Sequence, residues 1–163
     1  MRILQVSPAY SHRHGGLPKV VHQLSRKLVE LGVEVTVFTT HIGGSDTPDV
    51  PLGKPVDIDG VQVYYFSVTP PRTYMYTPQM TDALKHQVKT FDLVHINGLY
   101  LYPTMAASRA CRRQRVPYMI SPHGMLDPHA IRFQSTWKKK LYIWLIEKRN
   151  LRGAAALHFT SFE

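Results

Sequence analysis

Short apolar runs alternate with stretches of helical periodicity along the chain. Residues 3–6 form a buried-strand pattern that ends at a Ser-Pro pair. Residues 18–31 begin with a proline suited to a first helical turn and repeat apolar side chains every three or four positions, and Gly32 stands where a left-handed cap is expected. Residues 33–39 are rich in β-branched side chains. The chain therefore begins with a predicted strand, loop, helix and second strand, which is parallel to the first.

The same alternation continues to the end of the chain. Residues 41–60 are rich in Gly, Asp and Pro and are interpreted as a loop or a small hairpin. Residues 67–78, which contain a Pro-Pro pair, are expected to be a surface segment that exposes Tyr74, Met75 and Tyr76. Strands are predicted at 61–66, 92–97, 118–121 and 154–159, and helices at 77–89, 103–115 and 134–151. Strands alternating with helices predict an α/β fold, a Rossmann-like open sheet of mainly parallel strands flanked by helices.

Length and composition favour one globular domain over residues 1–163. Hydrophobic residues make up 44% of the chain and charged residues 19%, an ordinary balance for a packed core. No apolar stretch reaches the length of a membrane-spanning helix, and the N-terminal apolar run is too short for a signal peptide. Cys111 has no second cysteine to pair with, which is typical of a reducing compartment, so a cytoplasmic location is expected. The histidines lack metal-ligand spacing, and no metal is expected.

The charge is strongly basic. Lys and Arg number 20 against 11 Asp and Glu, a net charge of +9, which implies an anionic partner. A nucleic-acid groove would need interleaved aromatic residues and a recognisable module, and neither is found, so no nucleic acid is expected. An amphipathic basic stretch at 137–144 leaves open a contact with an anionic membrane at its inner face, or with the phosphate of a lipid-linked substrate. The clustered cations are Arg109, Arg112, Arg113 and Arg115 on one predicted helix and Lys138, Lys139, Lys140, Lys148, Arg149 and Arg152 on or near another, an arrangement also typical of solvated helix faces.

Polar residues and glycines follow the predicted strands, where open parallel sheets bind ligands. The first such loop ends in Gly15 and Gly16 directly before a helix, an arrangement that fits an anion cradle or, alternatively, a plain turn. Its spacing is not that of a dinucleotide site. Asn97-Gly98 follows a later strand, and His123-Gly124 follows the next, where an imidazole suits hydrogen bonding to a sugar hydroxyl or proton transfer. A purely structural role for His123 is the alternative, and His95 is expected to be a core histidine.

Several short motifs follow one another in a defined order. They are Ser7-Pro8, Gly15-Gly16, Leu28-x-x-x-Gly32 before Val33-Glu34-Val35-Thr36-Val37, Asp92-Leu93-Val94-His95-Ile96-Asn97-Gly98, Ser121-Pro122-His123-Gly124-Met125-Leu126-Asp127-Pro128 and Thr160-Ser161-Phe162-Glu163. Their order and spacing resemble the N-terminal domain of family 4 glycosyltransferases, and the resemblance covers residues 1–163.

The resemblance implies a GT-B architecture, in which two Rossmann-like domains face each other across a cleft and transfer a sugar from a nucleotide-sugar with retention of configuration. It implies that the second domain, which carries most of the donor site, is absent here, so the isolated chain is expected to be a truncated domain without activity. The acceptor hydroxyl would belong to a glycan, a lipid-linked acceptor or a small molecule. No cofactor is implied.

The resemblance also implies roles for residues of this sequence. His123 would be the catalytic residue beside the transferred sugar, either as a base or as a binding group, and Gly15 and Gly16 would let the first loop approach the donor phosphate and the acceptor. The expected acceptor-binding residues are Tyr10, His12, Arg13, His14, Asn97, Gly98, Tyr100, Gly124 and Asp127. The rival interpretations are a basic α/β domain that binds membranes or nucleic acid without catalysis, and a phosphate-binding enzyme complete in one domain.

Overall fold

The computed structural model describes residues 1–10, 16–41, 49–70, 72–125 and 143–159. The strands within them are β1 (Arg2–Ser7), β2 (Glu34–His41), β3 (Pro55–Ile58), β4 (Val61–Ser67), β5 (Leu93–Asn97), β6 (Tyr118–Ser121) and β7 (Ala156–Leu157). The α-helices are α1 (Leu17–Glu30), α2 (Pro78–Gln87), α3 (Tyr102–Gln114) and α6 (Lys148–Arg152). Short 3-10 turns are η1 (Arg72–Tyr74) and η2 (Val88–Thr90), and η3 (Ile143–Glu147) is a π-helical turn.

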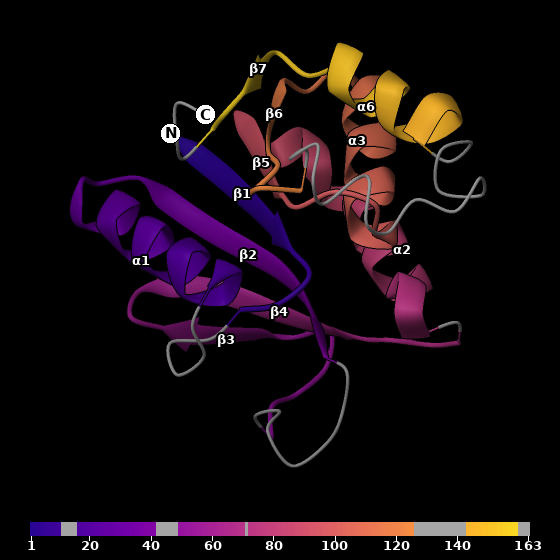
Figure 1. Cartoon of the computed structure of the whole chain (residues 1–163). Coiled ribbons are helices and arrows are strands. Elements are labelled where there is room, and N and C mark those ends of the chain that lie inside the picture. Colours follow the sequence, from indigo (N-terminus) through magenta and orange to yellow (C-terminus); the bar gives the residue numbers. More distant parts are fainter. Residues whose placement is uncertain (11–15, 42–48, 71, 126–142, 160–163) are drawn as a thin grey trace.

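The strands form one sheet in the order β3-β4-β2-β1-β5-β6-β7. Every neighbouring pair is parallel except β3 and β4, which are antiparallel. Helix α1 covers one face of the sheet, and α2, α3 and α6 lie on the other side (Figure 1). The Rossmann-like α/β fold with a mainly parallel sheet is therefore confirmed.

Two apolar cores hold the layers together. The larger core lies under α2 and α3 and includes Leu4, Phe38 and Leu84, all fully buried. The smaller core lies under α1 and includes Val21 and Val37. A fully buried aliphatic side chain stabilises a fold by about 1.5–3 kcal/mol relative to its exposed state. Strand β1 is buried on both sides, the pattern of a central strand in a sheet covered on both faces.

The structure corrects some element predictions. Residues 55–58 form β3, so the small-hairpin alternative for this part of the chain is correct. The last strand extends only over Ala156–Leu157, not 154–159. The first part of the helix predicted at 134–151 lies outside the described residues, and its end is the η3 turn and α6. The predicted exposure of Tyr74, Met75 and Tyr76 is wrong, because these side chains are half-buried.

Candidate functional site at the carboxyl ends of β5 and β6

The strand order places the end of β5 between the ends of β1 and β6. Asn97 closes β5 and lies in register with Ser121, the last residue of β6. The Gly98 N–H then donates to the Ser121 carbonyl over 2.9 Å, so the two strand-end loops start side by side. The predicted residues Asn97, Gly98, His123 and Gly124 are therefore brought to one edge of the sheet.

Asn97 and His123 form a direct hydrogen-bonded pair. The Asn97 amide nitrogen donates to Gln5 Oε1 over 2.9 Å, which turns its Oδ1 toward the His123 ring. His123 Nε2 lies 3.0 Å from that oxygen, and since a carbonyl oxygen only accepts, Nε2 carries the proton. The neutral His123 ring then has Nδ1 as its acceptor. A buried amide, 1% exposed, thus fixes the tautomer of a half-buried imidazole.

The backbone at His123 has an unusual conformation. His123 has a φ of +50° and Gly124 a φ of +77°, both in the left-handed region that side chains other than Asn, Asp and His seldom adopt. This tight turn directs the ring back toward Asn97. Burial, and next the charge of His158, lower the pKa of His123, so the imidazole is neutral near pH 7. A neutral ring can accept a hydrogen bond or a proton.

Gly98 is the point where three segments meet. Its φ is +90°, and a Cβ placed there would lie 3.6 Å from Met125 Cε and 3.8 Å from Leu17 Cδ2. Leu17 begins α1 and Met125 follows the His123 turn, so the helix start, the β5 loop and the β6 loop converge at this glycine. Gly16, with a φ of +70°, precedes α1 directly and is exposed.

Tyr100 lies in the same loop and is anchored by the last residue of η3, directly before α6. It has a φ of +64°, and its N–H donates to Glu147 Oε1 over 2.8 Å. Its hydroxyl donates to the Met125 carbonyl over 3.2 Å, which ties the β5 loop to the β6 turn. Glu147 is fully buried, and burial raises the pKa of its carboxyl. Sequence analysis missed Glu147, although a lone acidic residue in the apolar stretch Ile143–Glu147 is a signal that could have found it.

A second histidine network lies behind the first. His95 Nε2 and Ser121 Oγ are 2.6 Å apart, and Ser121 Oγ lies 2.9 Å from His158 Nδ1. His95 is 5% exposed, which confirms the expected core histidine. Burial, with smaller effects from His158 and His123, lowers its pKa to about 4. Sequence analysis left His158 without a role, and the register of β7 beside β6 is what brings it to this edge.

Tyr10 is not brought to the Asn97–His123 pair. Its ring belongs to the core under α1, is 5% exposed, and its hydroxyl lies 3.2 Å from His22 Nδ1. Burial raises the pKa of Tyr10 far above its usual value. A ring enclosed in this way has little surface left for an acceptor. The remaining predicted site residues, His12, Arg13, His14, Gly15 and Asp127, lie outside the described residues.

The described residues offer neither a metal site nor a membrane-spanning helix. No group of three or more His, Cys, Asp or Glu side chains there is arranged to hold a metal ion. No helix in the same residues has the length and hydropathy needed to cross a membrane.

Comparison with known proteins adds a family and a fold. The family model described as "Glycosyl transferase 4-like domain" matches residues 15–162. The crystal structure of Acinetobacter baumannii MurG is similar with a TM-score of 0.51 and 13% identity, over 97% of this chain and 40% of that one. An E. coli structure described as trehalose-6-phosphate bound with UDP-2-fluoro glucose is similar with a TM-score of 0.53 and 15% identity, over 99% and 40%. No curated protein matches the chain.

Proposed function

Since the chain belongs to the family of glycosyl transferase 4-like domains, we propose that its strand-end edge holds the acceptor of a sugar transfer from a nucleotide-sugar donor. Family membership supports glycosyl transfer, and the geometry supports the location. The acceptor is a compound with a free hydroxyl, such as a glycan, a lipid-linked sugar or a small molecule.

The observation that carries the proposal is the Asn97–His123 pair. Asn97 Oδ1 holds the proton on His123 Nε2, so Nδ1 is an acceptor for the hydroxyl that attacks the sugar. Gly98 has no side chain to obstruct this edge, and the exposed Gly16 lies one residue before the helix start that packs beside Gly98. Backbone N–H groups at the start of α1 are suited to a phosphate of the donor.

Different groups of the protein act on the acceptor and on the donor. In a retaining transfer the bond from the anomeric carbon to the diphosphate breaks and a bond to the acceptor oxygen forms on the same face. The hydroxyl proton, held at His123 Nδ1 before the reaction, turns to the departing phosphate as the new bond forms. The sugar has oxocarbenium character at the transition state. In this proposal His123 orients the hydroxyl, while preorganised N–H groups stabilise the charge that grows on the diphosphate.

The chain spans 40% of the length of each of the two solved structures to which it is similar. We therefore assign most of the nucleotide-sugar contacts to a second domain that closes over this edge. Domain closure would also exclude the water that otherwise hydrolyses the donor. On this account the 163-residue chain alone is expected to transfer no sugar.

The test is sugar transfer by the polypeptide that joins this chain to its donor domain, assayed with a panel of nucleotide-sugars. His123→Asn removes the imidazole and keeps a residue that tolerates the left-handed turn. We expect its kcat/KM to fall by about 100-fold or more. His86→Asn, an exposed position on α2, is the matched control and should keep the parental rate. Parental activity in His123→Asn would refute the site, and transfer by the isolated chain would refute the need for a second domain.

A further inference from the structure

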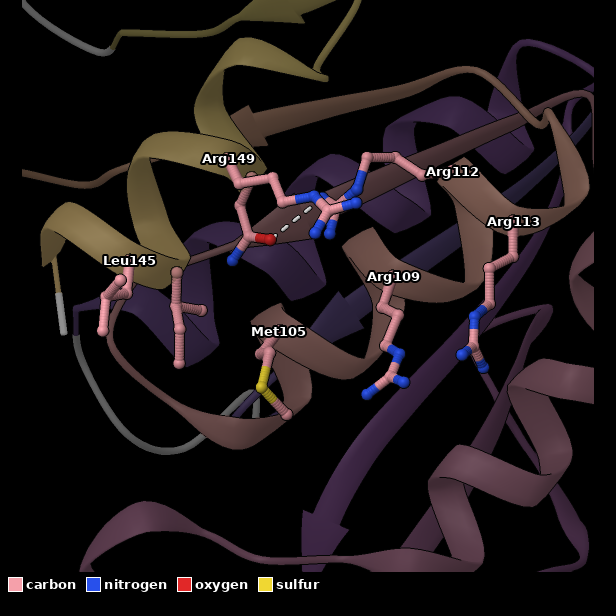
Figure 2. A pocket seen from close by; sticks show the side chains of 8 residues that line it. Met105, Arg109, Arg112, Arg113, Leu145 and Arg149 are labelled. Atoms are coloured by element: carbon pink, nitrogen blue, oxygen red, sulfur yellow. Dashed lines mark hydrogen bonds between the residues drawn. The ribbon is translucent and has the colours of Figure 1, made fainter.

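A basic hollow lies between α3 and α6, formed by parts of the chain that the proposed transfer site does not use. Its volume is about 550 Å³, within the range of roughly 300 to 1,000 Å³ common for small-molecule sites. Figure 2 shows the Arg109 and Arg113 side chains extending in the same direction from α3, and those of Arg112 and Arg149 extending toward each other between the helices. The lining residues are Met105, Arg109, Arg112, Arg113, Leu145, Ile146, Arg149 and Asn150.

A second hollow of about 460 Å³ shares Arg112 and Arg149 with the first and adds Lys148 and Arg152. No Asp or Glu among the described residues lines either hollow. Glu147, which follows Ile146 in the chain, is buried, and its two oxygens accept from the Tyr100 N–H and the Asn150 amide instead. The cations that line the two hollows therefore lack carboxylate partners within the described part of the chain.

Such a cluster raises the energy of the folded state. Arg109 and Arg113 are spaced i and i+4 on α3, where like charges repel each other. Arg109 lies in the middle of the helix, too far from its C-terminus to be stabilised by the helix dipole. An anion with at least two charges would relieve this repulsion.

Arg112 is held in place by hydrogen bonds and forms a fixed wall of the hollow. The Arg112 Nη1 group donates to Asn150 Oδ1 over 2.9 Å and lies 3.3 Å from the Tyr118 hydroxyl. The Tyr118 hydroxyl itself donates to the Asn150 carbonyl over 2.6 Å, which binds α6 to β6. Arg109, Arg113 and Arg149 are exposed and make no ion pair among the described residues, so their guanidinium forks are available to phosphate oxygens.

We propose that the hollow between α3 and α6 is a binding site for a phosphate ester or diphosphate group with two or more negative charges. Arg109, Arg113 and Arg149 bind its oxygens, and Arg112 supplies a fixed positive wall. The apolar side chains of Met105, Leu145 and Ile146 accommodate the organic part of the ligand. A soluble phosphate ester and the phosphomonoester headgroup of phosphatidic acid share this chemistry, and the experiment distinguishes them.

The experiment measures binding to the full chain by isothermal titration calorimetry with inorganic pyrophosphate at low ionic strength. In parallel, sedimentation measures binding to vesicles that contain phosphatidic acid and to vesicles of phosphatidylcholine alone. The test variant is Arg109→Gln/Arg149→Gln, with one change on each helix. Its control is Lys54→Gln/Lys89→Gln, which removes the same charge from exposed positions outside the hollow. Circular dichroism checks the fold, and the two single arginine variants replace the double variant if it is unfolded.

We expect the parent and the lysine control to bind pyrophosphate with similar affinity and the arginine variant to bind at least about tenfold more weakly. Arginine-dependent binding to phosphatidic acid vesicles, without pyrophosphate binding, would identify a lipid headgroup as the source of the same chemistry. Equal loss in the arginine and lysine variants, or no binding to either probe, would overturn the proposal.

Discussion

His95 is a buried imidazole whose protonation the fold opposes. Its pKa of about 4 in the folded chain compares with 6.5 for a free side chain, and burial is the main cause. Between these values the unfolded chain binds a proton that the folded chain does not, so the free energy of unfolding rises with pH. The stability contributed by the neutral form is present above the unfolded pKa and is lost as pH falls toward the folded pKa.

We predict that the parent chain loses about 2 kcal/mol of stability from this residue between pH 7 and pH 5. His95→Gln keeps an amide near Ser121 but does not titrate. Urea unfolding of both proteins at the two pH values gives the comparison, and the His95→Gln protein should show the smaller loss. The same pH dependence in both proteins would mean that His95 is not the titrating group.

Sequence reasoning found the polar residues at the strand ends because strand-end loops are recognisable from the pattern alone. It located Asn97, Gly98 and His123, but the bond between Asn97 and His123 depends on the β5–β6 register, which no local pattern encodes. The burial of Tyr10 was missed for a related reason. Whether a residue after β1 faces a ligand or the core depends on how α1 packs against the sheet. Here His22 of α1 contacts the Tyr10 ring and its hydroxyl, so Tyr10 is part of the core.

At the scale of elements, α6 is held to the sheet by a close contact at its end. Gly153 has an ordinary φ of −85°, so an alanine there meets no backbone strain. A Cβ, however, would lie 2.6 Å from the Tyr118 hydroxyl and 2.8 Å from Arg112 Cδ. The Tyr118 hydroxyl donates to the Asn150 carbonyl, so moving it away from the new methyl group would break this hydrogen bond.

Gly153→Ala is therefore expected to lower the free energy of unfolding by about 1–3 kcal/mol through overpacking. Tyr118→Phe alone should cost about 1 kcal/mol, the net value of the lost hydrogen bond. The double variant should be more stable than the sum of the two losses implies, because removing the hydroxyl makes room for the methyl group. Strictly additive losses in urea unfolding would show that the two groups do not touch.

Elements with a strong apolar periodicity could be predicted from the sequence. Elements whose bounds or burial depend on contacts with distant parts of the chain could not. Helix α1 has a marked apolar stripe and the expected left-handed glycine after it, and Gly32 indeed has a φ of +80°. Strand β7 pairs only with Met119 and Ile120 of β6, a limit that its own residues do not encode. Tyr74 and Tyr76 are half-buried because both rings pack edge-on against Tyr102 of α3, a contact between distant parts of the chain.

At the scale of the whole molecule, the excess of positive charge opposes folding at low salt. The net charge is +9, and the cations around the α3–α6 hollow lie close together. Added salt screens this repulsion because the Debye length falls from about 30 Å at 0.01 M to about 10 Å at 0.1 M. The melting temperature is therefore expected to rise with sodium chloride over this range, by about 2–4 °C for each kcal/mol of repulsion removed.

Differential scanning calorimetry of the parent and of Arg109→Gln/Arg149→Gln measures this effect. The variant should melt at a higher temperature than the parent in low salt and should respond less to added salt. A melting temperature that falls with salt in the parent would mean that ion pairs, such as that of Lys85 with Asp82, outweigh the repulsion.

The most direct measurement is a crystal structure of this chain joined to its donor domain, with a nucleotide-sugar and an acceptor bound. The account predicts the acceptor hydroxyl within hydrogen-bond distance of His123 Nδ1 and the transferred sugar next to Gly98. A reacting sugar bound at the opposite edge of the sheet, or in the hollow between α3 and α6, would contradict it.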